Sequence, residues 1–270
     1  VCGLVLAVAL FLSPTNRRQF GTLPAVTFDR DLFRRLVKFG APNGFHFFMD
    51  LMAFQFFIII LGRLGVVALG ASSLAFTLNA MAFIPICGLG MATSVLVGQA
   101  IGEKNIPLAK RAVSSALKLG WMYTAVMFVL FVFFPNVCCG PFMQPGAENA
   151  GEILGMAQKL LAIISIYLFF DATALVYVNA LKGAGDTYWT TMVGIAMAWG
   201  IYAIPSYIIF VYNGTILHMW GVLVLCVICL CAAFYIRFRR GAWQSMRVIE
   251  DFAPEVPADF EAAIIETEKG

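Results

Sequence analysis

The chain has 270 residues, of which 61% are hydrophobic and only 12% are charged, with a formal net charge of +3. Soluble domains carry about 25% charged residues, so this composition excludes an ordinary soluble domain. The basic residues are spread over several loops rather than gathered on one face, which excludes a nucleic-acid partner. Uncharged apolar segments, each long enough to cross a hydrocarbon core of about 30 Å, recur along the chain. The sequence therefore predicts an all-α membrane protein embedded in a lipid bilayer.

The chain begins with an apolar run over residues 1–12 that is too short to span a membrane. We interpret this run as the end of a preceding transmembrane helix, so that the chain is a fragment of a longer protein. Residues 13–40 contain six of the basic residues and are predicted to form a cytoplasmic loop. In the second half of this loop, apolar and basic positions mix as they do in an interfacial amphipathic helix.

Six membrane helices are expected over residues 41–236. Pro85 and Pro205 fall inside two of these helices, where proline usually produces a kink. Asp186 or Thr187 is expected to cap the fifth helix. The six predicted spans are Pro42–Leu61, Leu69–Gly98, Ala112–Phe134, Glu152–Leu181, Tyr188–Val211 and Thr215–Ile236.

Basic residues are distributed unequally between the two ends of these helices. Sixteen of them fall on one side, against only Arg63 and Lys159 on the other. Since cytoplasmic loops of membrane proteins are enriched in Lys and Arg, the loaded side is predicted to be cytoplasmic. Both termini then face the cytoplasm, and residues 237–270 form a cytoplasmic tail.

Two carboxylates lie inside segments that otherwise consist of apolar and uncharged residues. Asp50 is the only acidic residue between Lys38 and Arg63, and Asp171 is the only one between Lys159 and Lys182. A charged group at mid-membrane costs about 2.5–3.5 kcal/mol on insertion scales, so it normally faces the protein interior and marks an ion or substrate path. The alternative is a structural carboxyl that forms a hydrogen bond at a helix–helix contact.

Several side chains near these carboxylates are further candidates for a site. Tyr167 precedes Asp171 by four residues, so both lie on one helical face, and the phenol can donate to the carboxylate or offer its oxygen to a cation. His46 lies one turn before Asp50 and is either a proton shuttle or a structural group that forms a hydrogen bond. Phe47, Phe54 and Asn179 are candidates for the lining of a substrate cavity, and Asn79 for an amide ligand of a cation.

A set of motifs in fixed order is similar to the second half of the multidrug and toxic compound extrusion (MATE) transporters, in particular the NorM-like members. The set includes Pro42 followed eight residues later by Asp50, and Asn79 followed by Pro85-x-x-Gly88 and Val97-Gly98-Gln99-x-x-Gly102. It continues with Tyr167-x-x-x-Asp171 and a turn of sequence Lys182-Gly183-Ala184-Gly185-Asp186-Thr187. One departure is Asp50 itself, because NorM-like members usually carry the longer glutamate at this position.

This resemblance implies a twelve-helix transporter of two six-helix lobes, of which the chain holds the second, while residues 13–40 connect the lobes. The implied activity is export of small organic cations, such as drugs or toxic compounds, in exchange for Na⁺ or H⁺ at a bacterial inner membrane. The implied coupling site contains Asp50, Tyr167, Asp171 and Asn79. The partner is a missing N-terminal six-helix lobe, and no cofactor and no enzymatic activity are expected. Two alternatives stay open: a flippase for lipid-linked sugars, and a membrane receptor or scaffold.

Overall fold

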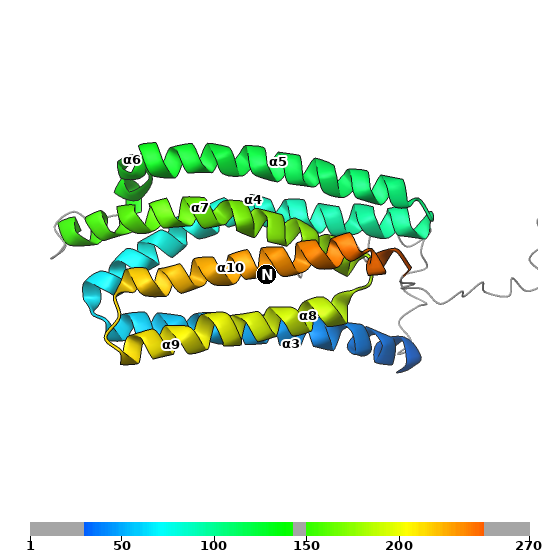
Figure 1. Cartoon of the computed structure of the whole chain (residues 1–270), viewed down its shortest axis with the longest axis horizontal. Helices are drawn as coiled ribbons and strands as arrows, with labels where there is room; N and C mark the ends of the chain where they lie inside the picture. The colour runs from blue at the N-terminus through cyan, green and yellow to red at the C-terminus, as the bar shows by residue number, and fades with distance from the viewer. Residues whose placement is uncertain (1–29, 143–149, 246–270) are drawn as a thin grey trace, which may run out of the picture. The chain divides into compact units, whose positions relative to one another are not determined.

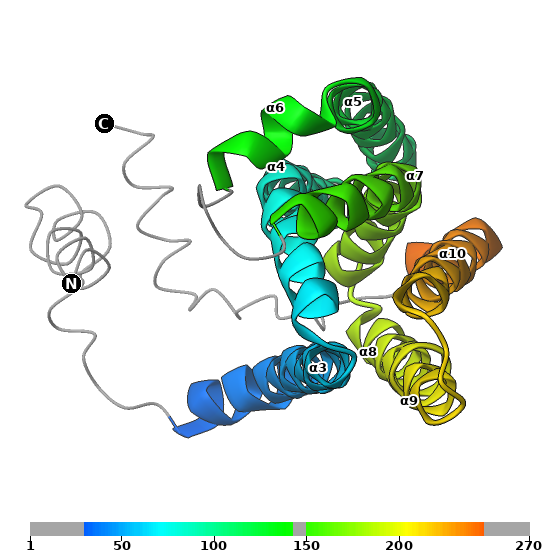
Figure 2. The same ribbon diagram turned by 90° about the vertical axis from the view of Figure 1, so that its left-hand side faces the viewer.

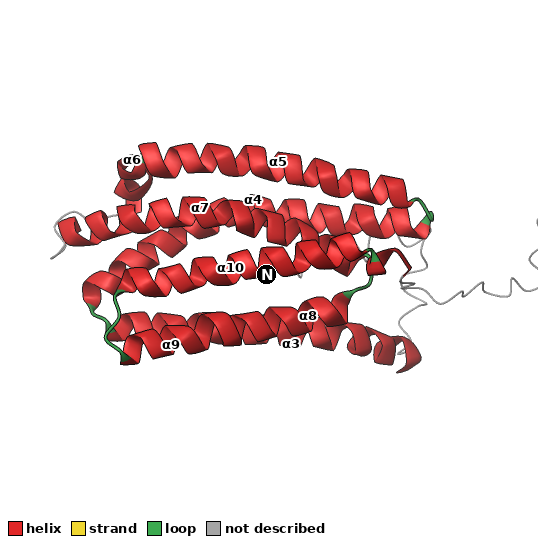
Figure 3. Cartoon of the chain, viewed as in Figure 1, coloured by secondary structure: helices red, strands yellow, loops and turns green. Residues whose placement is uncertain are grey.

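The computed structural model describes residues 30–142 and 150–245, and within these ranges it contains helices and no strand (Figure 3). The predicted all-α class is confirmed. Backbone contacts divide the chain into Val1–Phe45 and His46–Gly270. Most of the predicted segments 1–12 and 13–40, and the end of the tail from residue 246, lie outside the described residues.

The membrane helices agree with the predicted spans to within a few residues, except at the start of the first and the third. α3 (Arg30–Arg63) contains the first span and begins earlier, so that it crosses the boundary predicted at residues 40 and 41 without a break. Among the described residues, five helices that follow α3 are long and apolar enough to cross a membrane. They are α4 (Val66–Gly102), α5 (Ile106–Phe133), α7 (Ala150–Gly183), the continuous helix formed by α8 (Thr187–Met197), η2 (Ala198–Ala203) and α9 (Ile204–Val211), and α10 (Ile216–Arg240).

α7 is the most buried of these helices and packs against α4, α5 and α10. Figure 2 shows α7 with α4 and α5 on one side and α10 on the other. The second half of α3 joins this core through aromatic side chains. The ring of Phe57 lies 6.2 Å from that of Phe76 on α4 and 5.0 Å from that of Tyr202 in η2. Residues of α3, α4 and the α8–α9 helix therefore meet inside the unit that begins at His46.

α4 and α7 approach each other closely at a stripe of small residues on α4. Gly90, Ser94 and Gly98 recur every four residues and so lie on one face. A methyl group at Gly183 of α7 would lie 2.9 Å from the Cα atom of Ser94, and one at Gly98 would lie 3.3 Å from the Gly183 carbonyl oxygen. Small residues at such a crossing let two membrane helices pack backbone against backbone.

Gly183→Ala is therefore expected to destabilise the chain by about 1–3 kcal/mol, because the added methyl group forces two helix backbones apart. The matched control is Gly88→Ala on α4, where an added methyl group meets no atom within 4 Å. The measurement is the thermal unfolding midpoint of the purified chain in detergent. Equal midpoints for both variants would contradict the close crossing.

The two helices with internal prolines differ in how they accommodate them. α4 is continuous through Pro85 and bends between its ends (Figure 1). In the fifth span, the turn before Pro205 widens into the π-helical segment η2, where the N–H of Ile204 bonds to the Trp199 carbonyl five residues back. Proline has no N–H, and its ring collides with the carbonyl four residues earlier, so a wider turn relieves the clash. The predicted irregularity at Pro205 is thus a π turn.

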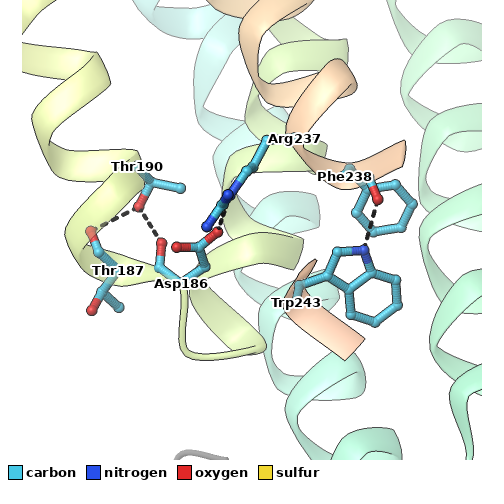
Figure 4. A network of polar contacts seen from close by, with 6 residues as sticks. All are labelled: Asp186, Thr187, Thr190, Arg237, Phe238 and Trp243. Atoms are coloured by element: carbon cyan, nitrogen blue, oxygen red, sulfur yellow. Dashed lines mark hydrogen bonds and ion pairs between the residues drawn. The ribbon is translucent and has the colours of Figure 1, made fainter. Parts of the chain in front are cut away.

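At the opposite end from the α9–α10 turn, a polar network ties the α7–α8 turn to α10 (Figure 4). Arg237 donates from Nε to Oδ2 of Asp186 at 2.7 Å, and its guanidinium lies 5.0 Å from the ring centre of Trp189. Asp186 occupies the N-cap position of α8, but its side chain does not cap the helix. Beside it, Trp243 donates to the Phe238 carbonyl and stacks on the Phe238 ring.

Candidate cation site

Asp171 and Tyr167 lie one turn apart on α7, the helix at the centre of the unit. Tyr167 is buried with 4% of its surface exposed, and Asp171 is half-buried. The hydroxyl of Tyr167 lies within electrostatic range of the Asp171 carboxylate. The structure therefore brings this predicted pair together inside the protein, as expected for residues spaced by four in a helix.

Asp171 has neighbours on two other helices. Cys87 on α4 and Cys231 on α10 both lie within electrostatic range of it. The carboxylate therefore lies among three helices of the same bundle, α4, α7 and α10. An intramembrane carboxylate at an ion or substrate path normally has protein around it in this way.

Asp50 lies on α3 and is half-buried. Within its electrostatic range are Cys226 on α10 and Lys182 in the last turn of α7. Asp50 on α3 and Asp171 on α7 thus both have a neighbour on α10. Sequence reasoning treated Lys182 only as a loop cation, whereas the structure places it half-buried at the end of α7.

The two predicted asparagines lie at different places. The Oδ1 atom of Asn79 on α4 is buried and has no hydrogen-bond partner in the described part of the chain. Asn179 donates from Nδ2 to the Leu175 carbonyl at 2.9 Å, and its side chain packs on Gly90 where α4 crosses α7. Asn79 consequently has an unused acceptor, while Asn179 is engaged at a helix contact.

The predicted cavity residues on α3 are only partly described. The side chain of His46 lies outside the described residues, although its backbone is helical. Phe47 is 65% exposed, and Phe54 is 37% exposed with its ring 5.0 Å from that of Phe76. Phe47 therefore presents an apolar surface that none of the described helices covers, and Phe54 lies at the edge of the aromatic core.

Sequence reasoning missed one residue near the Asp171 pair, Tyr202 in η2. Its hydroxyl is buried without a hydrogen-bond partner among the described residues, and it lies within electrostatic range of Tyr167. Pro205, three residues later, was the feature of the sequence that pointed to this region. It predicted a kink in the helix, but not which side chains the kinked turn directs into the protein. In the same helix, three other buried polar atoms have no partner within the described ranges: Thr191 Oγ1, Trp199 Nε1 and Ser206 Oγ.

Comparison with known proteins identifies the family. The model of the MatE family matches residues 42–208. The probable multidrug resistance protein NorM of Pseudomonas syringae pv. tomato is 26% identical over 222 residues, which are 82% of this chain and 48% of that protein. The NorM protein of Pseudomonas aeruginosa is 29% identical over 171 residues, which are 63% of this chain and 35% of that protein.

Solved structures agree with the helical arrangement. A crystal structure of MATE in complex with MaL6 has a TM-score of 0.76 at 18% identity and covers 89% of this chain and 54% of that one. A MOP superfamily transporter from Pyrococcus furiosus has a TM-score of 0.73 at 19% identity, with 89% and 54% covered. The chain spans about half the length of the relatives that it matches. With its family model matched over most of the membrane helices and its fold shared with MATE structures, the chain belongs to the MatE family.

Proposed function

We propose that this chain is the second lobe of an antiporter that exports small organic cations in exchange for Na⁺ or H⁺. The observation that carries the proposal is the pair formed by Asp171, which is half-buried, and Tyr167, which is buried, on the central helix of a MatE-family chain and close to α4 and α10. The names of the relatives, probable multidrug resistance proteins, support drugs as the substrate class.

The chemistry of the pair supports coupling. An intramembrane carboxylate has to be neutralised, either by a proton or by a cation. Asp171 therefore alternates between a form that holds the coupling ion and one that has released it, and Asp50 offers a second carboxylate from α3. The phenol of Tyr167 supplies a neutral oxygen that serves either occupant. Competition between the coupling ion and a cationic substrate for these charges produces exchange.

The membrane helices and the bacterial relatives support a multi-pass protein of the inner membrane. Within this membrane we place both termini on the cytoplasmic side, because that side carries most of the basic residues. We also propose that the chain acts together with a first six-helix lobe, since its relatives are about twice as long as the matched region. The substrate path then lies between the lobes, and the exposed Phe47 belongs to its wall.

The test is drug efflux from cells that produce residues 1–270 with and without a first lobe, supplied as a fusion from the Pseudomonas syringae relative. Efflux is expected only with both lobes, and only when a Na⁺ or H⁺ gradient is present. Efflux by residues 1–270 alone would contradict the two-lobe requirement. Flux of a lipid-linked sugar, with none of a cationic dye, would instead identify a flippase.

A further inference from the structure

A groove with a volume of about 370 Å³ lies between the second half of α4 and the first half of α5, apart from the proposed coupling site. Small side chains leave this space open, and leucines add apolar surface to it. The lining includes Ala92, Ala100, Ala112, Ala116, Leu96 and Leu119. The buried Thr93 adds no free polar group, because its hydroxyl donates to the Leu89 carbonyl at 2.8 Å. The inner part of the groove is therefore apolar.

The end of the groove at the α4–α5 turn is polar. Gln99 and Glu103 of α4 and Arg111 and Ser115 of α5 line it, and all four are exposed. In the described part of the chain, no carboxylate pairs with the Arg111 guanidinium. Lys118, also exposed, follows Ser115 by three residues and so lies on the same side of α5. Long side chains in helices point toward the helix N-terminus, so the Lys118 side chain runs toward Arg111.

The charge at this end favours an anionic ligand. Around the α4–α5 turn, Glu103 is the only acidic residue among four basic ones, Lys104, Lys110, Arg111 and Lys118. Basic pockets between membrane helices bind the headgroups of anionic lipids. The single carboxylate of Glu103 lies on the α4 side of the groove, opposite the basic side formed by α5.

The length of the apolar part fits one lipid leaflet. From Gln99 to Leu89, the groove follows α4 for about 15 Å at a rise of about 1.5 Å per residue, which is about half of a 30 Å hydrocarbon core. A ligand that fills it has an apolar chain as long as one leaflet is thick and a negative charge at one end. A phospholipid has both of these features.

We propose that this groove binds an anionic phospholipid. One acyl chain lies along the apolar part between α4 and α5, and the phosphate lies at Arg111 and Lys118. The bound lipid covers apolar surface that the two helices leave open and pairs two exposed cations, so it stabilises the α4–α5 pair. This site does not depend on the proposed coupling site.

The experiment measures thermal unfolding of residues 1–270 in nanodiscs of phosphatidylcholine with increasing shares of phosphatidylglycerol. Phosphatidylglycerol should raise the unfolding midpoint, since a ligand of the folded state stabilises it. For Arg111→Gln, the share that gives half of this rise should increase about fivefold, the loss expected for one basic residue at a lipid headgroup. The matched control is Lys110→Gln, which removes the same charge from the preceding residue, outside the groove, and should change this share by less than about twofold.

Two further variants separate the headgroup contact from the acyl chain. Arg111→Lys keeps the positive charge and should respond almost as the parent does. Ala92→Phe leaves the charge unchanged but places a ring in the groove, so it should weaken the response to phosphatidylglycerol.

Three results would overturn the inference. Equal responses of Arg111→Gln and Lys110→Gln would show a general effect of surface potential rather than a site. An equal rise with zwitterionic phosphatidylethanolamine would show that the groove does not select an anion. The same titration in the two-lobe protein should keep the response, and its loss there would show that the first lobe covers the groove.

Discussion

Replacing Asp171 with asparagine is expected to abolish coupled efflux while the protein still folds and inserts. The amide has nearly the shape of the carboxyl group, so the contacts of α7 with α4 and α10 persist. It carries no negative charge and no titratable proton, so neither Na⁺ nor H⁺ can be exchanged there. We expect the transport rate to fall at least about a hundredfold, which corresponds to about 2.7 kcal/mol. Stability should stay equal or rise, because an uncharged amide is less costly to bury than a carboxylate.

The matched control for this change is Glu152→Gln. Glu152 lies in the first turn of the same helix and is exposed, so the same loss of charge should leave efflux intact. The measurement is efflux of a cationic dye from energised cells that contain both lobes, with membrane expression and thermal unfolding followed in parallel. Normal efflux by Asp171→Asn would make Asp171 a structural carboxyl at a helix contact.

The helices were predictable because each membrane span is an uncharged apolar segment bounded by loops with charged residues, Gly or Pro. The second span, for example, is expected over Leu69–Gly98 and is observed as Val66–Gly102. The first span was less well bounded, because α3 continues back to Arg30 through a segment whose basic residues resemble a loop. Charge marks where a helix leaves the membrane, but it does not mark where the helix begins.

The site was predictable only in part. Asp171 and Tyr167 are recognised from spacing alone, since residues four apart in a helix share a face. Which helices surround them was not predictable, because a membrane helix that is apolar on all sides gives no indication of the face that it buries. Tyr202 and Cys226 were missed for this reason, and the side chain of His46 stays a prediction.

Asp186 and Arg237 illustrate a different limit. From sequence, Asp186 or Thr187 is expected to cap a helix, and Arg237 is one of several basic residues at the predicted cytoplasmic end of the last helix. The structure shows instead a nearly buried ion pair, with 4% of Asp186 and 23% of Arg237 exposed. The two residues are 51 positions apart in the chain and come together because α10 packs beside α8. Sequence spacing carries no information on such a pair.

Removing one member of this pair is expected to be the most destabilising single change at the α7–α8 turn. Arg237→Met keeps an apolar stem against Trp189 but leaves the Asp186 carboxylate buried without its cation. Breaking a fully buried pair in this way costs about 3–5 kcal/mol, and the partial exposure of Arg237 lowers our expectation to about 2–3 kcal/mol. The measurement is the thermal unfolding midpoint of the purified chain, with Arg239→Met as control, because Arg239 is exposed and donates to the exposed Tyr235 hydroxyl rather than to a buried carboxylate.

The double variant Asp186→Asn with Arg237→Met distinguishes the contribution of the ion pair to stability from that of the packing of Arg237 on Trp189. Because it leaves no unpaired charge, it should be more stable than Arg237→Met alone, and the difference measures the coupling between the two residues. If the two variants unfold at the same temperature, the loss comes from the contact of Arg237 with Trp189 rather than from the ion pair. A higher unfolding midpoint for the double variant than for Arg237→Met would show that the ion pair holds the α7–α8 turn against α10. Transport should then recover with stability, since neither Asp186 nor Arg237 belongs to the proposed coupling site.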